Sequence, residues 1–240
     1  MRFEGPWLRG RLLRRYRRFL ADIQLDSGAR ITAHTPNTGS LKGCAEPGLR
    51  VWVRDTGSSE RKYRHSWELV EAGSGALVGI HTGHSNLLVR EALETGKITG
   101  LQGYRGIRSE VRYGREGSRI DFLLEADDRP PCYVEVKNVT LVDGGIARFP
   151  DAVSVRGQKH LRELMEVVRQ GGRGVVFFCI QRADARAFRP ADDIDPDYGR
   201  LLRQALASGV EAMAWRARVD VGDIELEHPV PVVCPDVCAS

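Results

Sequence analysis

Three charged residues have types and spacing that could do chemistry together: Asp121, Glu135 and Lys137. Alternate side chains of a strand project to the same face, so Glu135 and Lys137 would point together while Val134 and Val136 enter the core. A hairpin turning through residues 127–131 would bring Asp121 alongside Glu135. The sequence therefore predicts a pocket that holds two acids and one lysine.

Two neighbouring carboxylates repel each other, and a hard divalent cation with oxygen ligands relieves that repulsion. Mg²⁺ is the expected occupant, with Mn²⁺ as a substitute. Such an ion could bind a phosphate and lower the pKa of a water, while Lys137 orients that water or stabilises the charge of the pentavalent phosphate. The implied reaction is phosphodiester hydrolysis. The alternative is that Glu135 and Lys137 form a solvated ion pair and Asp121 only ends a strand.

A second feature is a basic run near the N-terminus, which interleaves arginines with aromatic and aliphatic residues from Arg9 to Phe19. Residues 61–64 repeat this composition on what we expect to be another strand. Such surfaces follow a phosphate backbone and stack bases. The expected nucleic-acid contacts are Arg11, Arg14, Arg15, Tyr16, Arg17, Arg18, Lys62 and Arg64. The alternative is that the aromatic residues are core and the arginines a solvated face.

Charge is distributed unevenly along the 240 residues. Residues 1–80 carry 14 Lys and Arg against 8 Asp and Glu, whereas residues 81–240 carry 22 against 24. A basic module joined to one that bears the carboxylates suggests that the first grips a polyanion and the second processes it.

The elements around these residues indicate an α+β protein of two domains. Residues 1–81 consist of short β-like runs separated by turn signals, which favours a small OB-fold-like barrel, with an SH3-like barrel as the alternative. Residues 82–230 predict a helix capped by Ser85 or Asn86, three strands, a helix, a buried strand over 174–181, and a helix and strand after Asp195. This order predicts an α/β domain with a mixed sheet, and residues 231–240 form a tail.

The connection after Lys137 is expected to be a long loop over the site. Gln158 and Lys159 occupy the first turn of the helix that follows, where a basic residue and an amide can hold a phosphate or position a water.

Composition limits the other possibilities. No apolar run approaches the ~20 residues that span a bilayer, and no signal-peptide core follows Met1, so we expect a cytoplasmic location, free or associated with the nucleoid. The five cysteines show no Cys-x-x-Cys spacing, which supports neither a disulfide framework nor a cysteine zinc site.

Asp121, thirteen residues, then Glu135-Val136-Lys137, within an αβββαβ order, resembles the PD-(D/E)XK nuclease fold, with Ile120 in place of the motif's proline. Nearly the whole chain resembles the sugar fermentation stimulation protein A family. That resemblance rests on residues 15–22, Pro36-Asn37-Thr38-Gly39, residues 118–124, 149–153 and 156–161. It implies an OB-like domain, a nuclease-like domain, DNA binding with little sequence preference, and a role in regulating sugar (maltose) metabolism genes.

By this resemblance Asp121, Glu135 and the Val136 carbonyl would hold the metal, Lys137 would be the catalytic lysine and Gln158 an auxiliary residue. A further acid would be Glu91, Glu94 or Glu110. The first hypothesis is therefore a Mg²⁺-dependent nuclease that binds single- or double-stranded DNA. The second is a DNA-binding regulator that does not cleave, and the third is a phosphohydrolase of small molecules.

Overall fold

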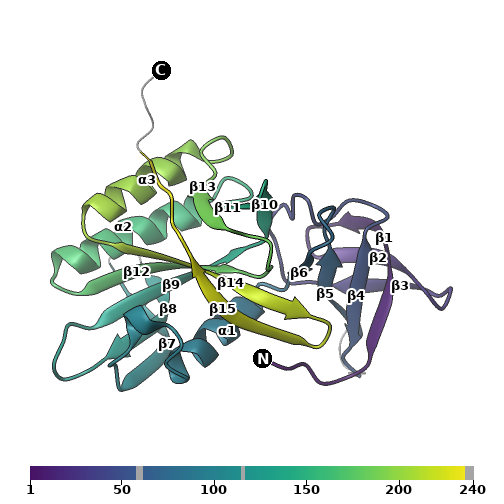
Figure 1. Ribbon diagram of the computed structural model, residues 1–240, viewed down its shortest axis with the longest axis horizontal. Coiled ribbons are helices and arrows are strands. Elements are labelled where there is room, and N and C mark those ends of the chain that lie inside the picture. Colours follow the sequence, from purple (N-terminus) through teal and green to yellow (C-terminus); the bar gives the residue numbers. More distant parts are fainter. Residues whose placement is uncertain (58–61, 115–116, 236–240) are drawn as a thin grey trace.

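The computed structural model describes residues 1–57, 62–114 and 117–235, and Figure 1 shows two domains side by side. The N-terminal domain contains β1 (Trp7–Tyr16), β2 (Leu20–Leu25), β3 (Arg30–His34), β4 (Arg50–Asp55), β5 (His65–Glu71) and β6 (Leu77–Gly79). Its sheet order is β3-β2-β1-β4-β5-β6, and β3 also pairs with β5. That pairing closes β1 to β5 into a barrel, which confirms the predicted OB-type fold.

The barrel closes because alternate strand residues are apolar and turn inward. Leu12, Ile23, Val51, Val53 and Trp67 are completely buried in its core. At Gly10 a Cβ atom would lie 2.4 Å from the Gln24 carbonyl oxygen, so only glycine permits this approach of β1 to β2.

The second domain is built on a six-stranded sheet of order β15-β14-β12-β9-β8-β7. Its strands are β7 (Gly106–Tyr113), β8 (Ser118–Glu125), β9 (Cys132–Val139), β12 (Arg173–Ile180), β14 (Glu211–Asp220) and β15 (Asp223–Val230). β9, β12 and β14 run parallel, while β7–β8–β9 and β14–β15 are antiparallel. The predicted mixed sheet is thus confirmed, with the apolar strand β12 near its centre.

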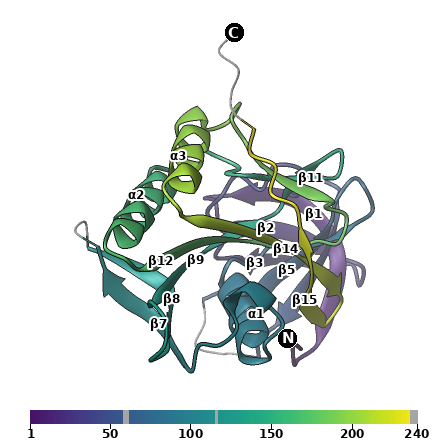
Figure 2. The same ribbon diagram turned by 60° about the vertical axis from the view of Figure 1, so that its left-hand side comes forward.

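Helices cover both faces of this sheet, as Figure 2 shows. α2 (Val155–Arg169) and α3 (Pro196–Ala207) pack on one face, and α1 (Gly83–Glu94), followed by a short 3₁₀ turn η1 (Thr99–Leu101), packs on the other. The order α1-β7-β8-β9-α2-β12 is the predicted αβββαβ succession. Within the three described ranges, no helix is long and apolar enough to cross a membrane.

Several predicted details were wrong. β1 ends at Tyr16, and Arg17 and Arg18 form the turn to β2 with positive φ values of 49° and 65°. Lys62 and Arg64 lie in the connection before β5 and not on a strand, and Arg61 is outside the described residues.

The long loop expected after Lys137 instead contains two strands, β10 (Leu141–Asp143) and β11 (Ile146–Phe149). They form a small sheet with β13 (Ala187–Pro190), another strand absent from the prediction, as was β15. Of the expected tail, residues 231–235 are described, and Val233 donates its N–H to the Phe188 carbonyl.

The two domains meet along the end of the barrel. The Gly79 N–H donates to the Gln181 carbonyl, and Val78 forms an isolated bridge with Arg182. A Cβ atom at Gly79 would lie 2.5 Å from Oε1 of Gln181, so a side chain at that position would displace the Gln181 side chain at the domain contact. On the other side of the contact, Asp151 Oδ2 accepts the Leu41 N–H at 2.9 Å.

Candidate active site

Asp121 lies where two strands separate. β8 and β9 are paired only from Phe122 to Leu124, so Asp121 stands at the first position beyond that pairing. Opposite it on β7, Glu110 has a positive φ of 54°, which is uncommon for a residue other than glycine, while the β7–β8 register is the same on both sides of it. Beyond the paired residues, the Asp121 carboxylate lies against β9 and α1, where it bonds Val136 and Asn86.

Both oxygens of Asp121 accept hydrogen bonds. Oδ2 accepts the Val136 N–H at 2.7 Å, and Oδ1 accepts the Asn86 amide at 2.8 Å. Burial raises the pKa of the Asp121 carboxyl to about 6, and the negative charge of Glu135 acts in the same direction. Without a neighbouring cation, the Asp121 carboxyl therefore ionises at a higher pH than an ordinary aspartate.

Glu135 and Lys137 point together, as the period of the strand predicted, but toward α2 and into the protein. Their exposed fractions are 3% and 8%, which contradicts the alternative of a solvated surface pair. Lys137 Nζ donates to Glu135 Oε1 at 2.8 Å, and the same oxygen contacts Nδ1 of His160. Burial alone would raise the pKa of Glu135, yet the Lys137 charge and the His160 contact hold it below its ordinary value.

His160, on the second turn of α2, is the site residue that the sequence analysis missed. Its Nδ1 lies 3.1 Å from Lys137 Nζ, and its Nε2 accepts a long hydrogen bond of 3.4 Å from Arg156 Nε. Because Nε2 accepts, the network assigns the ring proton to Nδ1, which donates to Glu135. The motif over residues 156–161 contains His160, but the sequence pattern assigned it no role, and only the three-dimensional direction of the helix shows that it faces β9.

Gln158 does not join this group. Its amide nitrogen donates to both carboxylate oxygens of Asp195, at 3.0 and 3.2 Å. Asp195 also caps α3 by accepting the Tyr198 N–H and binds the Ser154 N–H, so Gln158 connects α2 to α3. The catalytic role predicted for Gln158 stays a prediction, and the residue of α2 that contacts Glu135 in the structure is His160.

The three acids proposed as a further metal ligand lie in different places. Glu91 binds the amino group of Met1, and Glu94 pairs with Arg90. Glu110 alone lies beside Asp121 in the sheet. The residue of α1 that contacts Asp121 is Asn86 and not an acid. Ser85 bonds Asn138, and neither Ser85 nor Asn86 is the predicted helix cap, because the N-cap position is Thr82.

A cleft of about 690 Å³ separates the barrel from this site. Lys137, Val136 and Asn86 line its second-domain wall, and Arg15 and Arg18 line its barrel wall. The loop after β3, with the Pro36-Asn37-Thr38-Gly39 motif, forms its rim. Part of the basic run therefore lines the same cavity as Lys137, the candidate catalytic lysine.

The other predicted nucleic-acid contacts are arranged differently. Arg14 pairs with Asp22, which also accepts the Tyr16 hydroxyl, and Arg64 pairs with Asp55. Arg11 donates to the Gly48 carbonyl, and Lys62 stacks on Tyr63. Arg17 is exposed in the β1–β2 turn, and Lys159 is half-buried in the first turns of α2.

Arg15 is held firmly in place. Its guanidinium donates to the carbonyls of Asn37, Gly39 and Ser40 at 2.8–2.9 Å, and burial lowers its pKa. Arg15 therefore shapes the rim loop, while Arg18 at the turn is the more exposed cation of the cleft wall.

The fold and site together define a class: a two-domain protein with an OB-type barrel and a mixed-sheet domain of PD-(D/E)XK nuclease-like topology. Family models agree, since residues 13–80 match the SfsA N-terminal OB domain and residues 83–223 match the sugar fermentation stimulation protein RE domain. The chain belongs to the sugar fermentation stimulation protein (SfsA) family.

Relatives cover nearly the full length. Sugar fermentation stimulation protein homologs from Citrifermentans bemidjiense and Geobacter sp. strain M21 are 58% and 59% identical over 233 residues, which is 97% of this chain and 100% of each relative. A solved structure of SfsA from Pyrococcus furiosus in complex with Ca²⁺ has a TM-score of 0.87 and 29% identity. It covers 97% of this chain and 99% of that one.

Proposed function

We propose that this protein binds DNA in the cleft between its domains and hydrolyses phosphodiester bonds with Mg²⁺ at Asp121 and Glu135. The observation that carries the proposal is the Glu135 carboxylate. Its Oε2 is buried and has no hydrogen-bond partner among the described residues, although buried polar atoms are normally paired. A cation would satisfy this oxygen.

The donor set suits a hard cation. Two carboxylates and the Val136 carbonyl offer oxygen ligands, which Mg²⁺ and Mn²⁺ prefer. The raised pKa of Asp121 has the same implication, because a cation would stabilise its charged form. The related Pyrococcus furiosus protein was solved with Ca²⁺, another oxygen-seeking ion.

The remaining roles belong to side chains of this chain. When bound, the metal would polarise the scissile phosphate and acidify a water. Lys137 would orient that water or stabilise the developing charge, and its contact with Glu135 fixes its ammonium group at the cleft wall. His160 contacts the same Glu135 oxygen as Lys137 does, and Arg15 and Arg18 would contact the DNA backbone.

Aromatic side chains beside the cleft rim support recognition of nucleic acid. The rings of Phe19, His34 and Tyr63 follow one another at centroid distances of 5.7 and 6.5 Å, and Phe19 is 39% exposed. Exposed aromatic faces next to cations suit stacking against unpaired bases without sequence preference.

A second candidate is a DNA-binding regulator of sugar metabolism genes that does not cleave. It is favoured by one observation: Asp121 already accepts two hydrogen bonds and Glu135 Oε1 already has two nitrogen partners, so protein groups compensate much of the charge. This arrangement could persist without a metal.

The deciding experiment uses labelled single- and double-stranded DNA with Mg²⁺, Mn²⁺ or EDTA, beside Glu135→Gln and Lys137→Ala. Glu94→Gln is the matched acid control, since Glu94 is exposed and pairs with Arg90. Cleavage that requires metal, is lost in both site variants and persists in Glu94→Gln is the expected result. DNA binding without metal-dependent cleavage on either substrate would leave the regulator.

A further inference from the structure

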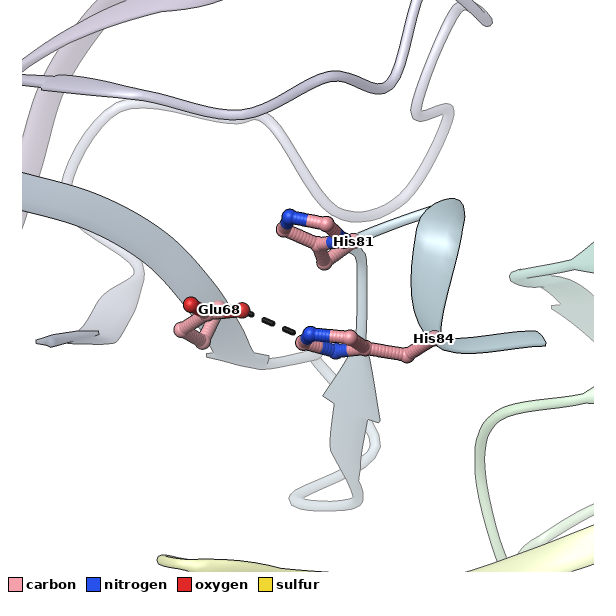
Figure 3. Close-up of side chains that lie close together, drawn as sticks. All are labelled: Glu68, His81 and His84. Carbon is pink, nitrogen blue, oxygen red and sulfur yellow. Dashed lines mark ion pairs between the residues drawn. The ribbon is translucent and has the colours of Figure 1, made fainter. Parts of the chain in front are cut away.

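A second group of metal-ligating side chains lies at the junction of the two domains. Glu68 comes from β5 of the barrel, His81 from the connection after β6, and His84 from the first turn of α1 (Figure 3). One ligand atom from each residue lies within 4.8 Å of the others. The group is separate from Asp121 and Glu135, which belong to β8 and β9.

Each of these three side chains has a buried atom without a partner. Among the described residues, Glu68 Oε2, His81 Nδ1 and His84 Nδ1 make no hydrogen bond. The other oxygen of Glu68 accepts from Arg54 at 3.1 and 3.2 Å, so Oε2 is the end turned toward the histidines. Three unsatisfied atoms converging in one place are unusual for a protein interior.

An ordinary ion pair does not account for this arrangement. Glu68 Oε2 lies 3.6 Å from His84 Nδ1, which is too long for a hydrogen bond. A buried imidazole nitrogen that faces a carboxylate oxygen at this distance, with neither atom hydrogen-bonded, matches two metal ligands of one ion.

We propose that Glu68, His81 and His84 bind one Zn²⁺ ion at the domain junction. Two imidazole nitrogens and one carboxylate oxygen are a zinc donor set that leaves a fourth position for water. Bonds of about 2.0–2.2 Å in a tetrahedron place neighbouring ligand atoms ~3.3–3.6 Å apart. The Glu68–His84 separation of 3.6 Å already meets this requirement.

One ring must turn when the ion binds. The imidazoles of His81 and His84 are stacked, with centroids 4.0 Å apart and planes 11° apart, so their lone pairs do not yet meet at one point. The second side-chain torsion of histidine has a broad energy profile, and a rotation of one ring requires little backbone movement. His81 is only partly buried, whereas His84 is buried, so His81 is the ring that lies nearer to solvent.

Zinc here would connect the barrel to the second domain. Glu68 is 1% exposed and bonds Arg54 within the barrel, and His84, at the start of α1, is 5% exposed. Asn86, two residues after His84, donates to Asp121, and Thr82 and Ser85 line the cleft. Zn²⁺ would therefore fix α1 against the barrel and hold the width of the cleft, independently of whether DNA is cleaved.

The test is calorimetric titration of Zn²⁺ into the full-length protein after EDTA treatment and removal of the chelator. The titrated proteins are wild type, His81→Ala, His84→Ala, and a double variant Asp121→Asn/Glu135→Gln that removes the other candidate metal site. His228→Ala is the matched histidine control, since its side chain is 60% exposed on β15. We expect one Zn²⁺ per chain in wild type, the double variant and His228→Ala, and at least about tenfold weaker binding in both cluster variants.

A spectroscopic readout accompanies the titration. Co²⁺ in place of Zn²⁺ is expected to give the visible absorption of a tetrahedral site in wild type and not in His81→Ala. Melting in EDTA verifies that each variant is folded, and His81→Ala decides the matter if His84→Ala does not fold. Absence of Zn²⁺ binding to the wild type, unchanged affinity in folded His81→Ala, or loss of binding only in the double variant would overturn the proposal.

Discussion

At the proposed metal site, the ionisation of Asp121 should make metal binding depend on pH. Its pKa is raised to about 6, above the ordinary carboxyl value, so the protonated form favours folding at low pH and this contribution is lost as pH rises through about 6. A cation that requires ionised Asp121 must displace that proton below pH 6.

Mg²⁺ is therefore expected to raise the melting temperature at pH 8 and to lose affinity by up to about tenfold per pH unit below pH 6. Thermal melts at several Mg²⁺ concentrations between pH 4.5 and 8 measure this dependence. In Asp121→Asn, any remaining effect of Mg²⁺ on the melting temperature should no longer change near pH 6. If the effect of Mg²⁺ on the wild type is also constant through pH 6, Asp121 is not a metal ligand.

His160 and Gln158 provide a paired test at the same scale. His160→Ala removes the Nδ1 contact with Glu135, and loss of such a supporting group typically lowers metal affinity or activity by about 10–100-fold. Gln158→Ala should instead cost ~0.5–1.5 kcal/mol of stability through Asp195 and keep most cleavage. Cleavage kinetics and urea denaturation of both variants distinguish these effects, and the reverse result would restore Gln158 to the site.

These residues show which parts of the candidate site could be predicted from the sequence. Period-two alternation placed Glu135 beside Lys137, and the hairpin brought Asp121 to them, because both follow from local geometry. His160 and Asn86 were missed because their contacts depend on how two helices pack on the sheet, which no local pattern specifies. The sequence also suggested uniform roles for the arginines, whereas acids eight and nine residues away pair with Arg14 and Arg64 once the chain has folded back on itself.

At the scale of elements, Asp195 connects α2 and α3. It is 1% exposed, caps α3 through the Tyr198 N–H, and accepts from Ser154 at the start of α2 and from Gln158. Asp195→Ala leaves several donors unpaired and should cost about 2–3 kcal/mol, more than an ordinary cap. Urea denaturation measures the loss.

Asp197→Ala is the control for this prediction, since it lies in the same helical turn but is exposed and pairs only with Arg200. A change within about 0.5 kcal/mol is expected there. Equal losses in the two variants would mean that Asp195 acts only through the helix dipole. The cap itself was predictable from Asp195 followed by Pro196, whereas β10, β11 and β13 were not, because strands of three or four residues carry little periodic signal.

At the scale of the whole molecule, the predicted DNA-contacting residues divide into those that line the cleft, such as Arg18, and those that pair with acids, such as Arg14. Arg18→Ala should weaken DNA binding and lower the slope of log affinity against log salt by about one, because Arg18 lines the cleft. Arg14→Ala should leave that slope nearly unchanged, because Arg14 is compensated by Asp22. Fluorescence anisotropy at several salt concentrations measures both, and equal slopes for the two variants would mean that DNA does not enter the cleft.

The contact of Gly79 with Gln181 has a consequence for synthesis on the ribosome. The five barrel strands lie within the first 71 residues and can pair soon after they emerge, but the surface around Gly79 is covered only when Gln181 has been made. At roughly 5–20 residues per second, the intervening hundred or so residues take about 5–20 s. During that interval the nascent barrel presents Leu69, Leu77 and Trp52, whose side chains pack against the core of the second domain in the finished protein, to whatever meets the growing chain.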